Sequence, residues 1–411
     1  MTATFVIVGA SLAGAKAAEA LRAGGFDGQL VLCGEEPERP YERPPLSKGY
    51  LLGDEDRDSV YVHPHQWYAD HDVDLRLEAR VTAVEPATRR VRLADGEELR
   101  YDRLLLATGA SPRRLQVPGD DLEGVHYLRT AADSERLRAA LRRCGNRAGR
   151  VVVVGAGWIG LEVAAAARTY GTEVTIIEPE RTPLYRVLGP ELGEVFADLH
   201  RSKGVRLLLD SAVTEFRGEA GSVRSVLTSG GEVLPADVVV VGVGVQPNAE
   251  LAVGAGLTVD DGVRVDASLR SSDPNIYAAG DVAAVQSPLL GRRLRVEHWA
   301  NALDGGAAAG RSMLGEDVSY DRVPYFFSDL YDLGMEYAGH TGPGEYDRVV
   351  YRGDKQGLEF VAFWLSGGRV VAGMNVNVWD VNDDIKALIR AGHPTDPDKL
   401  TDPAVPLSDL A

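Results

Sequence analysis

The 411-residue sequence predicts an α/β fold with two Rossmann-type dinucleotide-binding domains and a C-terminal α+β domain. Residues 5–14 and 151–160 each contain an apolar run, a glycine-rich turn and the start of an alanine-rich helical pattern. After residue 320, apolar strand patterns at 360–365 and 370–378 precede a helical pattern at 384–391. This last segment is expected to form a separate domain.

The first fingerprint reads FVIVGASLAG, with Gly9 and Gly14 as its outer glycines. Ser11 replaces the middle glycine of the usual G-x-G-x-x-G pattern, and serine is small enough for backbone to approach a pyrophosphate there. A helix that begins near Leu12 and Ala13 would direct free N–H groups and its positive dipole end toward the phosphates. The alternative is an ordinary tight turn between a strand and a helix.

Two further segments support a dinucleotide at the first fingerprint. Glu35 ends the next predicted strand, where a carboxylate can accept both ribose hydroxyls, although Glu36 beside it leaves the register open. An apolar strand then ends in Ala107, Thr108 and Gly109, and glycine allows the backbone to come close to a ligand. The residues expected to bind the first cofactor are Gly9, Ser11, Leu12, Ala13, Gly14, Glu35, Ala107, Thr108 and Gly109.

The second fingerprint reads VVVVGAGWIG and contains Gly155, Gly157, Trp158, Ile159 and Gly160. One unit of this kind binds one dinucleotide, so two units indicate two dinucleotides with a shared reactive point. The simplest chemistry with that requirement is hydride transfer from a nicotinamide to a flavin.

Glu178 ends the strand that follows the second fingerprint. An acid at this position binds the ribose 2′-hydroxyl and repels a 2′-phosphate, so the sequence favours NADH. Arg181 could accommodate a 2′-phosphate, which leaves NADPH possible. Val243 and Gly244, after the apolar strand at 238–241, are also expected to contact a cofactor.

The order of these motifs predicts three domains along the chain. The FAD-binding domain is expected to be discontinuous and to comprise residues 1–115 and 245–320. The NAD(P)-binding domain would lie between them at 116–244, and the C-terminal α+β domain would cover 321–411.

Composition limits the classes of partner. The formal net charge of −17 argues against nucleic acid, because phosphate binding depends on basic patches. No apolar run is long enough for a membrane span, and the N-terminus begins directly with a strand pattern, so neither a membrane anchor nor a signal peptide is expected. Cys33 and Cys144 alone give no disulfide framework, which favours a cytoplasmic location. No metal site is predicted, and the oligomeric state is left open.

Several motifs together resemble one family. The glycine turns, the Ala-Thr-Gly turn, the block YERPPLSK at 41–48 and the block YAAGDV at 277–282 are similar to those of FAD-dependent NAD(P)H:ferredoxin reductases, the putidaredoxin and rhodocoxin reductase type. The resemblance covers essentially the whole chain. It implies a glutathione-reductase-like fold and a role in bacterial cytochrome P450 or aromatic-ring dioxygenase systems.

The resemblance also implies flavin contacts. Asp281 would hydrogen-bond the ribityl chain of FAD, and a helix opening at Glu297, His298 and Trp299 would point its N-terminus at the flavin pyrimidine. For the His298 side chain itself we favour a capping or core role. Further FAD contacts are implied for Arg43, Pro44, Arg129 and the backbone at Val81.

Lys48 and Glu162 are the expected catalytic residues. A carboxylate buried near cofactors is costly unless it is paired, and lysine is its natural partner. The resemblance implies that Lys48 also contacts FAD, beside the flavin N5 edge, and that Glu162 orients the nicotinamide. The alternative is that both residues only brace helices.

The electron acceptor follows from what the sequence lacks. Disulfide reductases of this fold need a vicinal cysteine pair, which is missing, so electrons are expected to leave singly to a one-electron carrier. The resemblance implies that this carrier is a [2Fe–2S] ferredoxin that serves a cytochrome P450 or oxygenase. The alternatives are a quinone or oxygen as acceptor, or a redox-sensing protein related to apoptosis-inducing factor.

Two features complicate the ferredoxin interpretation. Tyr325 and Phe327 stand where the resembled reductases usually carry tryptophans, which leaves the electron path open. Ferredoxins of this kind are acidic, so docking to a chain of charge −17 would need a local cationic patch. The candidates are Arg292, Arg293, Arg295 and Arg311.

Overall fold

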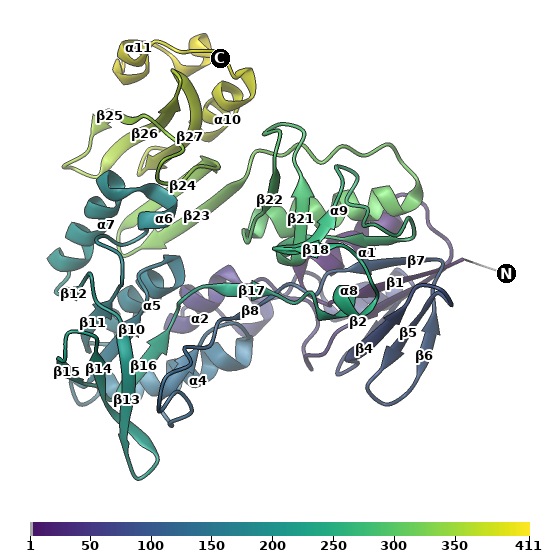
Figure 1. The fold of residues 1–411 in the computed structure, drawn as a ribbon, viewed down its shortest axis with the longest axis horizontal. Helices are drawn as coiled ribbons and strands as arrows, with labels where there is room; N and C mark the ends of the chain where they lie inside the picture. The colour runs from purple at the N-terminus through teal and green to yellow at the C-terminus, as the bar shows by residue number, and fades with distance from the viewer. Residues whose placement is uncertain (1–2) are drawn as a thin grey trace. The chain divides into compact units, whose positions relative to one another are not determined.

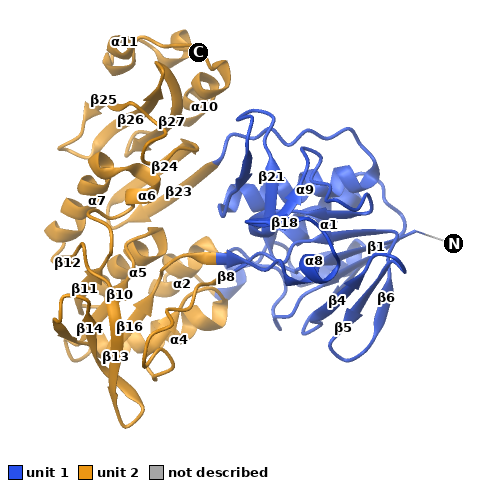
Figure 2. Cartoon of the chain, in the orientation of Figure 1, with its two compact units in different colours: residues 1–42, 57–111, 246–324 blue, residues 43–56, 112–245, 325–411 orange. Residues whose placement is uncertain are grey.

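The computed structural model describes residues 3–411, which form two compact units (Figure 2). The first unit contains residues up to 42 together with 57–111 and 246–324. The second contains residues 43–56, 112–245 and 325–411. The three predicted domain boundaries remain predictions, and the two units differ from them in two main respects. The predicted C-terminal domain falls in the same unit as the predicted NAD(P)-binding domain. Residues 43–56 pack with the second unit, although the expected FAD-binding domain included them.

The first unit is built on a parallel sheet of order β20-β7-β1-β2-β3 (Figure 1). The strand bounds are β1 (Thr4–Val8), β2 (Gln29–Cys33), β3 (Val73–Arg76), β7 (Arg103–Leu106) and β20 (Ile276–Ala278). The central strands are buried along their apolar runs, as expected for a parallel sheet covered on both faces. Parallel pairing places the carboxyl ends of β1, β7 and β20 at one edge, where the first glycine turn begins.

Helices α1 (Leu12–Ala23) and α9 (Trp299–Leu314) pack closely together in this unit. Small residues make the close approach possible, because a Cβ atom at Gly306 would collide with the carbonyl oxygen of Ala13. At Gly310 it would lie 2.7 Å from the oxygen of Ala17. Gly306 and Gly310 of α9 therefore lie directly against Ala13 and Ala17 of α1.

Two smaller sheets complete the first unit. One is antiparallel and contains β4 (Val81–Glu85), β5 (Arg90–Leu93) and β6 (Glu98–Arg100). The other is mixed and contains β18 (Val259–Asp260), β19 (Gly262–Val265), β21 (Ala283–Gln286) and β22 (Arg293–Arg295). Short helices lie in the connections: η2 (Arg57–Val60), α3 (His65–Asp70), α8 (Glu250–Gly254) and η3 (Gly280–Val282).

The second unit repeats the parallel architecture, with the sheet order β12-β11-β10-β16-β9. Its strands are β9 (Val125–Tyr127), β10 (Arg150–Val154), β11 (Glu173–Ile177), β12 (Arg206–Leu208) and β16 (Val238–Val241). Its helices are η1 (Pro44–Ser47), α2 (Gly49–Leu52), α4 (Ala131–Gly145), α5 (Trp158–Thr169), α6 (Tyr185–Leu188) and α7 (Pro190–Ser202). A three-stranded antiparallel sheet follows, with β13 (Val213–Glu219), β14 (Ser222–Thr228) and β15 (Val233–Pro235).

The C-terminal part of the second unit is an antiparallel sheet of order β23-β24-β27-β26-β25. Its elements are β23 (Tyr325–Leu330), β24 (Leu333–Gly339), β25 (Arg348–Asp354), β26 (Glu359–Ser366), β27 (Arg369–Val376), α10 (Asn382–Ala391), α11 (Pro397–Thr401) and η4 (Leu407–Leu410). Strand β23 packs against α5, so this α+β domain shares the core of the second parallel sheet. The predicted α/β fold with a C-terminal α+β domain is confirmed.

A remaining pair of short strands, β8 (Ala110–Pro112) and β17 (Val245–Pro247), lies at the ends of the predicted NAD(P)-binding segment. Within residues 3–411, no helix combines the length and the apolar character that crossing a bilayer requires.

Candidate active site

The first glycine turn has the geometry of a phosphate-binding turn. Gly9 adopts a φ of +119°, and a Cβ atom there would collide with the carbonyl oxygen of Ala107 at the end of β7. A Cβ atom at Gly14 would collide with the oxygen of Gly9. Only glycine therefore permits the backbones of β1, α1 and β7 to approach this closely.

Helix α1 begins directly after this turn without a capping side chain. Ser11 occupies the N-cap position but makes no capping hydrogen bond, and the first turn contains no acidic residue. Helix α4 of the same chain differs, because Thr130 and Asp133 form a complete capping box. The first N–H groups of α1, including those near Leu12 and Ala13, are thus available to an anion, and the turn fits the pyrophosphate of FAD.

The Ala107–Gly109 turn is held by Asn248. The Thr108 hydroxyl donates to the Asn248 carbonyl oxygen at 2.7 Å, and Asn248 Nδ2 donates to the Thr108 carbonyl oxygen at 2.8 Å. The Asn248 N–H donates to Gly109, and Ser111 Oγ donates to Asn248 Oδ1 at 2.7 Å. Asn248 was not among the predicted site residues, although it follows Val243 and Gly244 closely in sequence.

Asp281 lies in η3, beside the first glycine turn. Gly280 has a φ of +76°, and a Cβ atom there would lie 3.2 Å from Cβ of Ala13. Asp281 therefore shares the edge formed by β1, β7 and β20, where the resemblance expects FAD.

Arg295 connects Asp281 with the start of α9. Its Nη1 atom lies 2.5 Å from Glu297 Oε1 and 3.4 Å from the Asp281 carbonyl oxygen, and its Nε lies 3.0 Å from Asp261. His298 is the N-cap residue of α9, but its side chain makes no capping hydrogen bond, so a capping role for it is not supported. Trp299 is the first residue of this helix.

Glu35 and Val81, two other expected FAD contacts, lie outside the first glycine turn. Glu35 lies two residues after β2, is largely exposed and pairs with Arg80 at 3.7 Å. Its neighbour Glu36 instead accepts a hydrogen bond from Tyr41 at 2.5 Å. Val81 is the buried first residue of β4. The roles of Glu35 and Val81 remain predictions.

The second glycine turn is similar to the first and more open. A Cβ atom at Gly155 would collide with the Gly242 carbonyl oxygen, whereas a Cβ atom at Gly157 would meet nothing within 4 Å. Gly157 caps α5 without a side chain, and no acidic residue lies in the first helical turn. Ile159 in that turn is 43% exposed. The open surface and the uncapped helix start fit the pyrophosphate of a second dinucleotide.

Neighbouring residues complete this second site. Trp158 packs edge-on against Phe196 and Phe326, with ring centroids 5.5 and 5.0 Å apart. A Cβ atom at Gly160 would collide with the oxygen of Gly155, which explains the third glycine of the fingerprint.

Glu178 lies just after β11 and is bound to the second glycine turn. Its Oε2 accepts a hydrogen bond from the Ala156 N–H at 2.6 Å, and its Oε1 accepts one from the Glu180 N–H at 3.0 Å. Arg181 is exposed, with its guanidinium 4.9 Å from the centroid of the Tyr185 ring. The acid expected to bind a ribose hydroxyl is therefore at the turn, with a cation close to it in sequence.

Residues 242–244 face the same turn from the end of β16. A Cβ atom at Gly242 would lie 3.6 Å from the N atom of Gly160. Gly244 has a φ of +95°, and its carbonyl oxygen accepts a hydrogen bond from the Arg113 N–H at 2.9 Å. Val243, between them, is half-buried.

Lys48 and Glu162 form a buried ion pair. Lys48 Nζ lies 2.5 Å from Glu162 Oε1, and the two side chains are 16% and 5% exposed. Two serines that were not among the predicted site residues also bind Glu162. Ser47 Oγ donates to Oε2 at 2.5 Å and Ser328 Oγ donates to Oε1 at 2.7 Å. The predicted pairing of Lys48 with Glu162 is present, and the carboxylate has three donors.

The local sequence explains how Lys48 reaches Glu162. Pro44 begins the short helix η1 together with Pro45, and the Lys48 N–H caps it by donating to the Pro45 carbonyl oxygen. Ser134 on α4 donates to the Leu46 carbonyl oxygen at 2.8 Å and fixes the helix to the second unit.

The guanidinium of Arg43 donates to the Arg129 carbonyl oxygen, so these two expected FAD contacts lie together in the second unit.

Tyr325 and Phe327 on β23 are both half-buried. The Tyr325 hydroxyl donates to Glu336 Oε1 at 2.7 Å, and Lys386 Nζ lies 4.5 Å from the centroid of its ring. Phe327 lies 6.0 Å from Lys48 Nζ, measured to the ring centroid. Phe327 is thus beside the buried ion pair, and Tyr325 is fixed by a carboxylate.

The expected cationic docking patch is only partly present. Arg293 donates to the carbonyl oxygens of Val265 and Ala284, both at 2.7 Å, and Arg295 is 9% exposed and paired with two acids. These two arginines hold strands of the first unit together, and their part in docking a partner stays a prediction. Arg311, at the exposed end of α9, remains a candidate.

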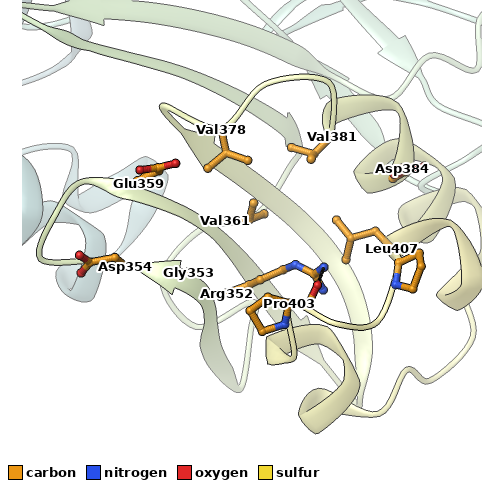
Figure 3. A pocket seen from close by; sticks show the side chains of 11 residues that line it. Arg352, Gly353, Asp354, Glu359, Val361, Val378, Val381, Asp384, Pro403 and Leu407 are labelled. Carbon is orange, nitrogen blue, oxygen red and sulfur yellow. Dashed lines mark hydrogen bonds between the residues drawn. The ribbon is translucent and has the colours of Figure 1, made fainter.

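The C-terminal domain contains a separate hollow of about 490 Å³ (Figure 3). Val361, Val378 and Leu407 contribute apolar surface to it. Arg352 on its rim donates to the carbonyl oxygens of Asp402 and Pro403, so its charge is used to hold the C-terminal segment. None of the predicted site residues lines this hollow. Across residues 3–411, no three His, Cys, Asp or Glu side chains are grouped as metal ligands.

Comparisons with known proteins cover nearly the whole chain. A family model described as pyridine nucleotide-disulphide oxidoreductase matches residues 3–306, and a model described as reductase C-terminal matches residues 325–411. The sequence is 44% identical to the ferredoxin–NAD(+) reductase component of the anthranilate 1,2-dioxygenase system of Burkholderia cepacia, over 98% of each chain. It is 39% identical to rhodocoxin reductase of Rhodococcus erythropolis, over 97% of this chain and 92% of that protein.

The fold is also similar to a solved structure. The crystal structure of the covalent putidaredoxin reductase–putidaredoxin complex matches with a TM-score of 0.94 and 37% identity, over 99% of this chain and 97% of that chain. The similarity includes both fingerprints and the C-terminal domain.

Proposed function

Because this chain belongs to the pyridine nucleotide-disulphide oxidoreductase family and is an FAD-dependent oxidoreductase that uses NADH, we propose that it reduces a [2Fe–2S] ferredoxin. This ferredoxin would in turn serve a cytochrome P450 or a ring-hydroxylating oxygenase. The relatives named above supply the class of acceptor. The observation that carries the proposal is the buried ion pair of Lys48 and Glu162. Glu162 lies on α5, two residues after Gly160 of the second glycine turn.

The residues of the first unit would hold FAD. The turn from Gly9 to Gly14 and the uncapped start of α1 would bind its pyrophosphate, and Asp281 would accept hydrogen bonds from the ribityl chain. The start of α9 at Trp299 carries no acidic side chain in its first turn, so its positive dipole end would favour negative charge on the pyrimidine edge. When bound, FAD supplies the link between a two-electron donor and one-electron acceptors.

The residues of the second unit would hold NADH. The turn from Gly155 to Gly160 and the start of α5 would bind its pyrophosphate, with Glu178 at the adenosine ribose. Glu162, on the same helix, would orient the nicotinamide, and Lys48 would contact the flavin edge. A charged pair in this position supplies fixed polar groups where water is excluded.

The cysteines argue for an acceptor other than a disulfide. Burial raises the pKa of the Cys33 thiol to about 11, and it raises the pKa of Cys144 as well. The thiolate is the reactive form in thiol–disulfide exchange, so neither side chain suits that chemistry at neutral pH. An acceptor that takes single electrons fits these side chains better. We also propose a cytoplasmic location, consistent with the soluble electron-transfer relatives.

The test combines the cofactors with defined acceptors. Anaerobic NADH should bleach the flavin absorbance, and added ferredoxin should then permit NADH-dependent reduction of cytochrome c. A panel of [2Fe–2S] ferredoxins would identify the partner. Rapid NADH oxidation in air without any ferredoxin would contradict the proposal and favour a small-molecule acceptor.

FAD binding can be tested separately through Asp281. Replacement by alanine should weaken FAD binding by about 1–3 kcal/mol, because the acceptor for the ribityl hydroxyls is lost. Flavin occupancy after dialysis measures this, and Asp281→Asn, which keeps one carbonyl oxygen, should retain more flavin. Full occupancy of Asp281→Ala would contradict the assignment.

A further inference from the structure

Two buried serines converge on the carboxylate of Glu162. Ser47 is 2% exposed and binds Oε2, while Ser328 is fully buried and binds Oε1. They are far apart in sequence and come from different elements, because Ser47 ends η1 and Ser328 lies in the middle of β23. The proposed function assigns no role to either hydroxyl.

The donors leave the Glu162 carboxylate little freedom. Oε1 is contacted by the Ser328 hydroxyl and by Lys48 Nζ, and Oε2 is contacted by the Ser47 hydroxyl. Hydrogen bonds to a charged acceptor are stronger than those between neutral groups. Both carboxylate oxygens are thus held by donors from different elements, η1 and β23, and rotation of the carboxylate would break at least one bond.

Lys48 has a second acid in its electrostatic environment. Burial raises the pKa of Asp329, and the positive charge of Lys48 acts to lower it. Asp329 follows Ser328 on β23 and, unlike Ser328, is exposed. Firm anchoring of Glu162 by the serines keeps this carboxylate in place as the partner of Lys48, although another acid is near.

We propose that Ser47 and Ser328 are positioning residues that fix the Glu162 carboxylate for the nicotinamide and hold its ion pair with Lys48 in one geometry. Ser328 belongs to the C-terminal domain, so this domain takes part in the step that uses NADH. The inference rests on the role proposed above for Glu162.

Ligand binding tests the inference without turnover. NAD+ contains the nicotinamide, whereas ADP-ribose lacks it but keeps the pyrophosphate and both riboses. Ser328→Ala and Ser47→Ala should each weaken NAD+ binding by about tenfold and leave ADP-ribose binding within about twofold. Equal losses for both ligands would mean that the whole second site is damaged and would overturn the inference.

A matched control measures the effect of removing a buried hydroxyl that does not contact Glu162. Thr172 follows α5, is fully buried, and its hydroxyl donates to the Ala167 carbonyl oxygen at 2.9 Å, away from Glu162. Thr172→Val should leave the ratio of NAD+ to ADP-ribose affinity unchanged. A change equal to that of Ser328→Ala would assign the effect to packing and overturn the inference.

A double-mutant cycle shows whether Ser328 acts through Glu162. In stopped-flow experiments on the FAD-loaded protein, Ser328→Ala should slow flavin bleaching by NADH by about tenfold, but should add almost nothing to Glu162→Gln. Additive losses would overturn the inference. If the serine variants behave like wild type while Glu162→Gln is defective, the inference is overturned but the proposed role of Glu162 is not. Wild-type behaviour of Glu162→Gln would overturn the proposed role of Glu162 and the inference together.

Discussion

Glu178 makes two backbone hydrogen bonds within the protein, independently of any cofactor. Its carboxylate accepts hydrogen bonds from the Ala156 and Glu180 N–H groups. A carboxylate that serves both the glycine turn and a ribose is difficult to replace without affecting NADH as well. Specificity at this residue is therefore expected to depend on charge and on turn geometry together.

Substitution of Glu178 by alanine should raise the ratio of NADPH to NADH use. The repulsion of a 2′-phosphate disappears while Arg181 remains. The ratio of kcat/KM for the two cofactors should shift by roughly tenfold, a shift that corresponds to ~1.4 kcal/mol. Glu178→Gln is the control for charge alone, because it preserves the size of the side chain. An unchanged or lower ratio in both variants would show that Glu178 does not read the ribose.

His200 on α7 is a buried histidine outside the proposed site. Its Nδ1 lies 3.1 Å from the Tyr331 hydroxyl, and its Nε2 has no hydrogen-bond partner within residues 3–411. Burial lowers the pKa of His200 to about 4. The folded protein therefore binds fewer protons at this residue than the unfolded chain between about pH 4 and the unfolded value of ~6.5.

Stability should consequently fall as the pH is lowered through this window. His200 should reduce the free energy of unfolding by about 2 kcal/mol at pH 5 relative to pH 7.5. Urea unfolding of the wild type and of His200→Asn at both pH values measures the effect, since the variant should lose this part of the pH dependence. The exposed His393 provides a control, and His393→Asn should keep the wild-type slope. Identical slopes for wild type and His200→Asn would contradict the prediction.

At the scale of secondary-structure elements, the packing of α9 against α1 influences the geometry of the first glycine turn. Helix α9 approaches α1 through glycines, and a side chain at Gly306 would collide with the backbone of Ala13. Ala13 belongs to the turn that is proposed to bind FAD. The position of the turn thus depends on a helix nearly 300 residues further along the chain.

Gly306→Ala should destabilise the first unit by about 1–3 kcal/mol, because the added methyl group meets backbone that cannot rotate away. FAD retention should fall with it. The control is Gly254 in α8, where a Cβ atom would meet nothing within 4 Å. Gly254→Ala should leave stability unchanged or raise it by about 0.5–1 kcal/mol. Thermal unfolding and flavin release measure both, and equal behaviour of the two variants would contradict the packing argument.

The sequence predicted the elements whose signals are local. The glycine turns and the parallel strands followed from motifs of a few residues. The pairing of Lys48 with Glu162 joins distant positions, and it was expected from the cost of an unpaired buried carboxylate and from the resemblance. Ser47, Ser328 and Asn248 were missed because their hydrogen bonds join residues separated by more than 100 positions. Such contacts depend on how distant segments pack, which hydrophobic periodicity does not encode.

At the scale of the whole molecule, the arginines of the expected cationic patch are also placed by contacts with distant segments. A run of arginines in sequence looks like exposed charge, but Arg293 and Arg295 are bound by carbonyl oxygens and acids from other segments. The net charge of −17 remains, so an acidic ferredoxin still needs local attraction to associate. Among the four candidate arginines, Arg311 is the exposed one and lies near the C-terminal end of α9.

Arg311→Glu should slow ferredoxin-dependent reduction of cytochrome c by about tenfold at low ionic strength, mainly through slower association. The difference from wild type should shrink as salt is added, because exposed charges are screened. NADH-to-ferricyanide turnover needs no docked protein and should stay close to wild type. Arg100→Glu on β6 changes the net charge equally at another exposed position and should have a much smaller effect. Equal slowing by both variants would show that total charge, rather than the surface around Arg311, controls the encounter. Loss of ferricyanide turnover in Arg311→Glu would indicate damage to the fold.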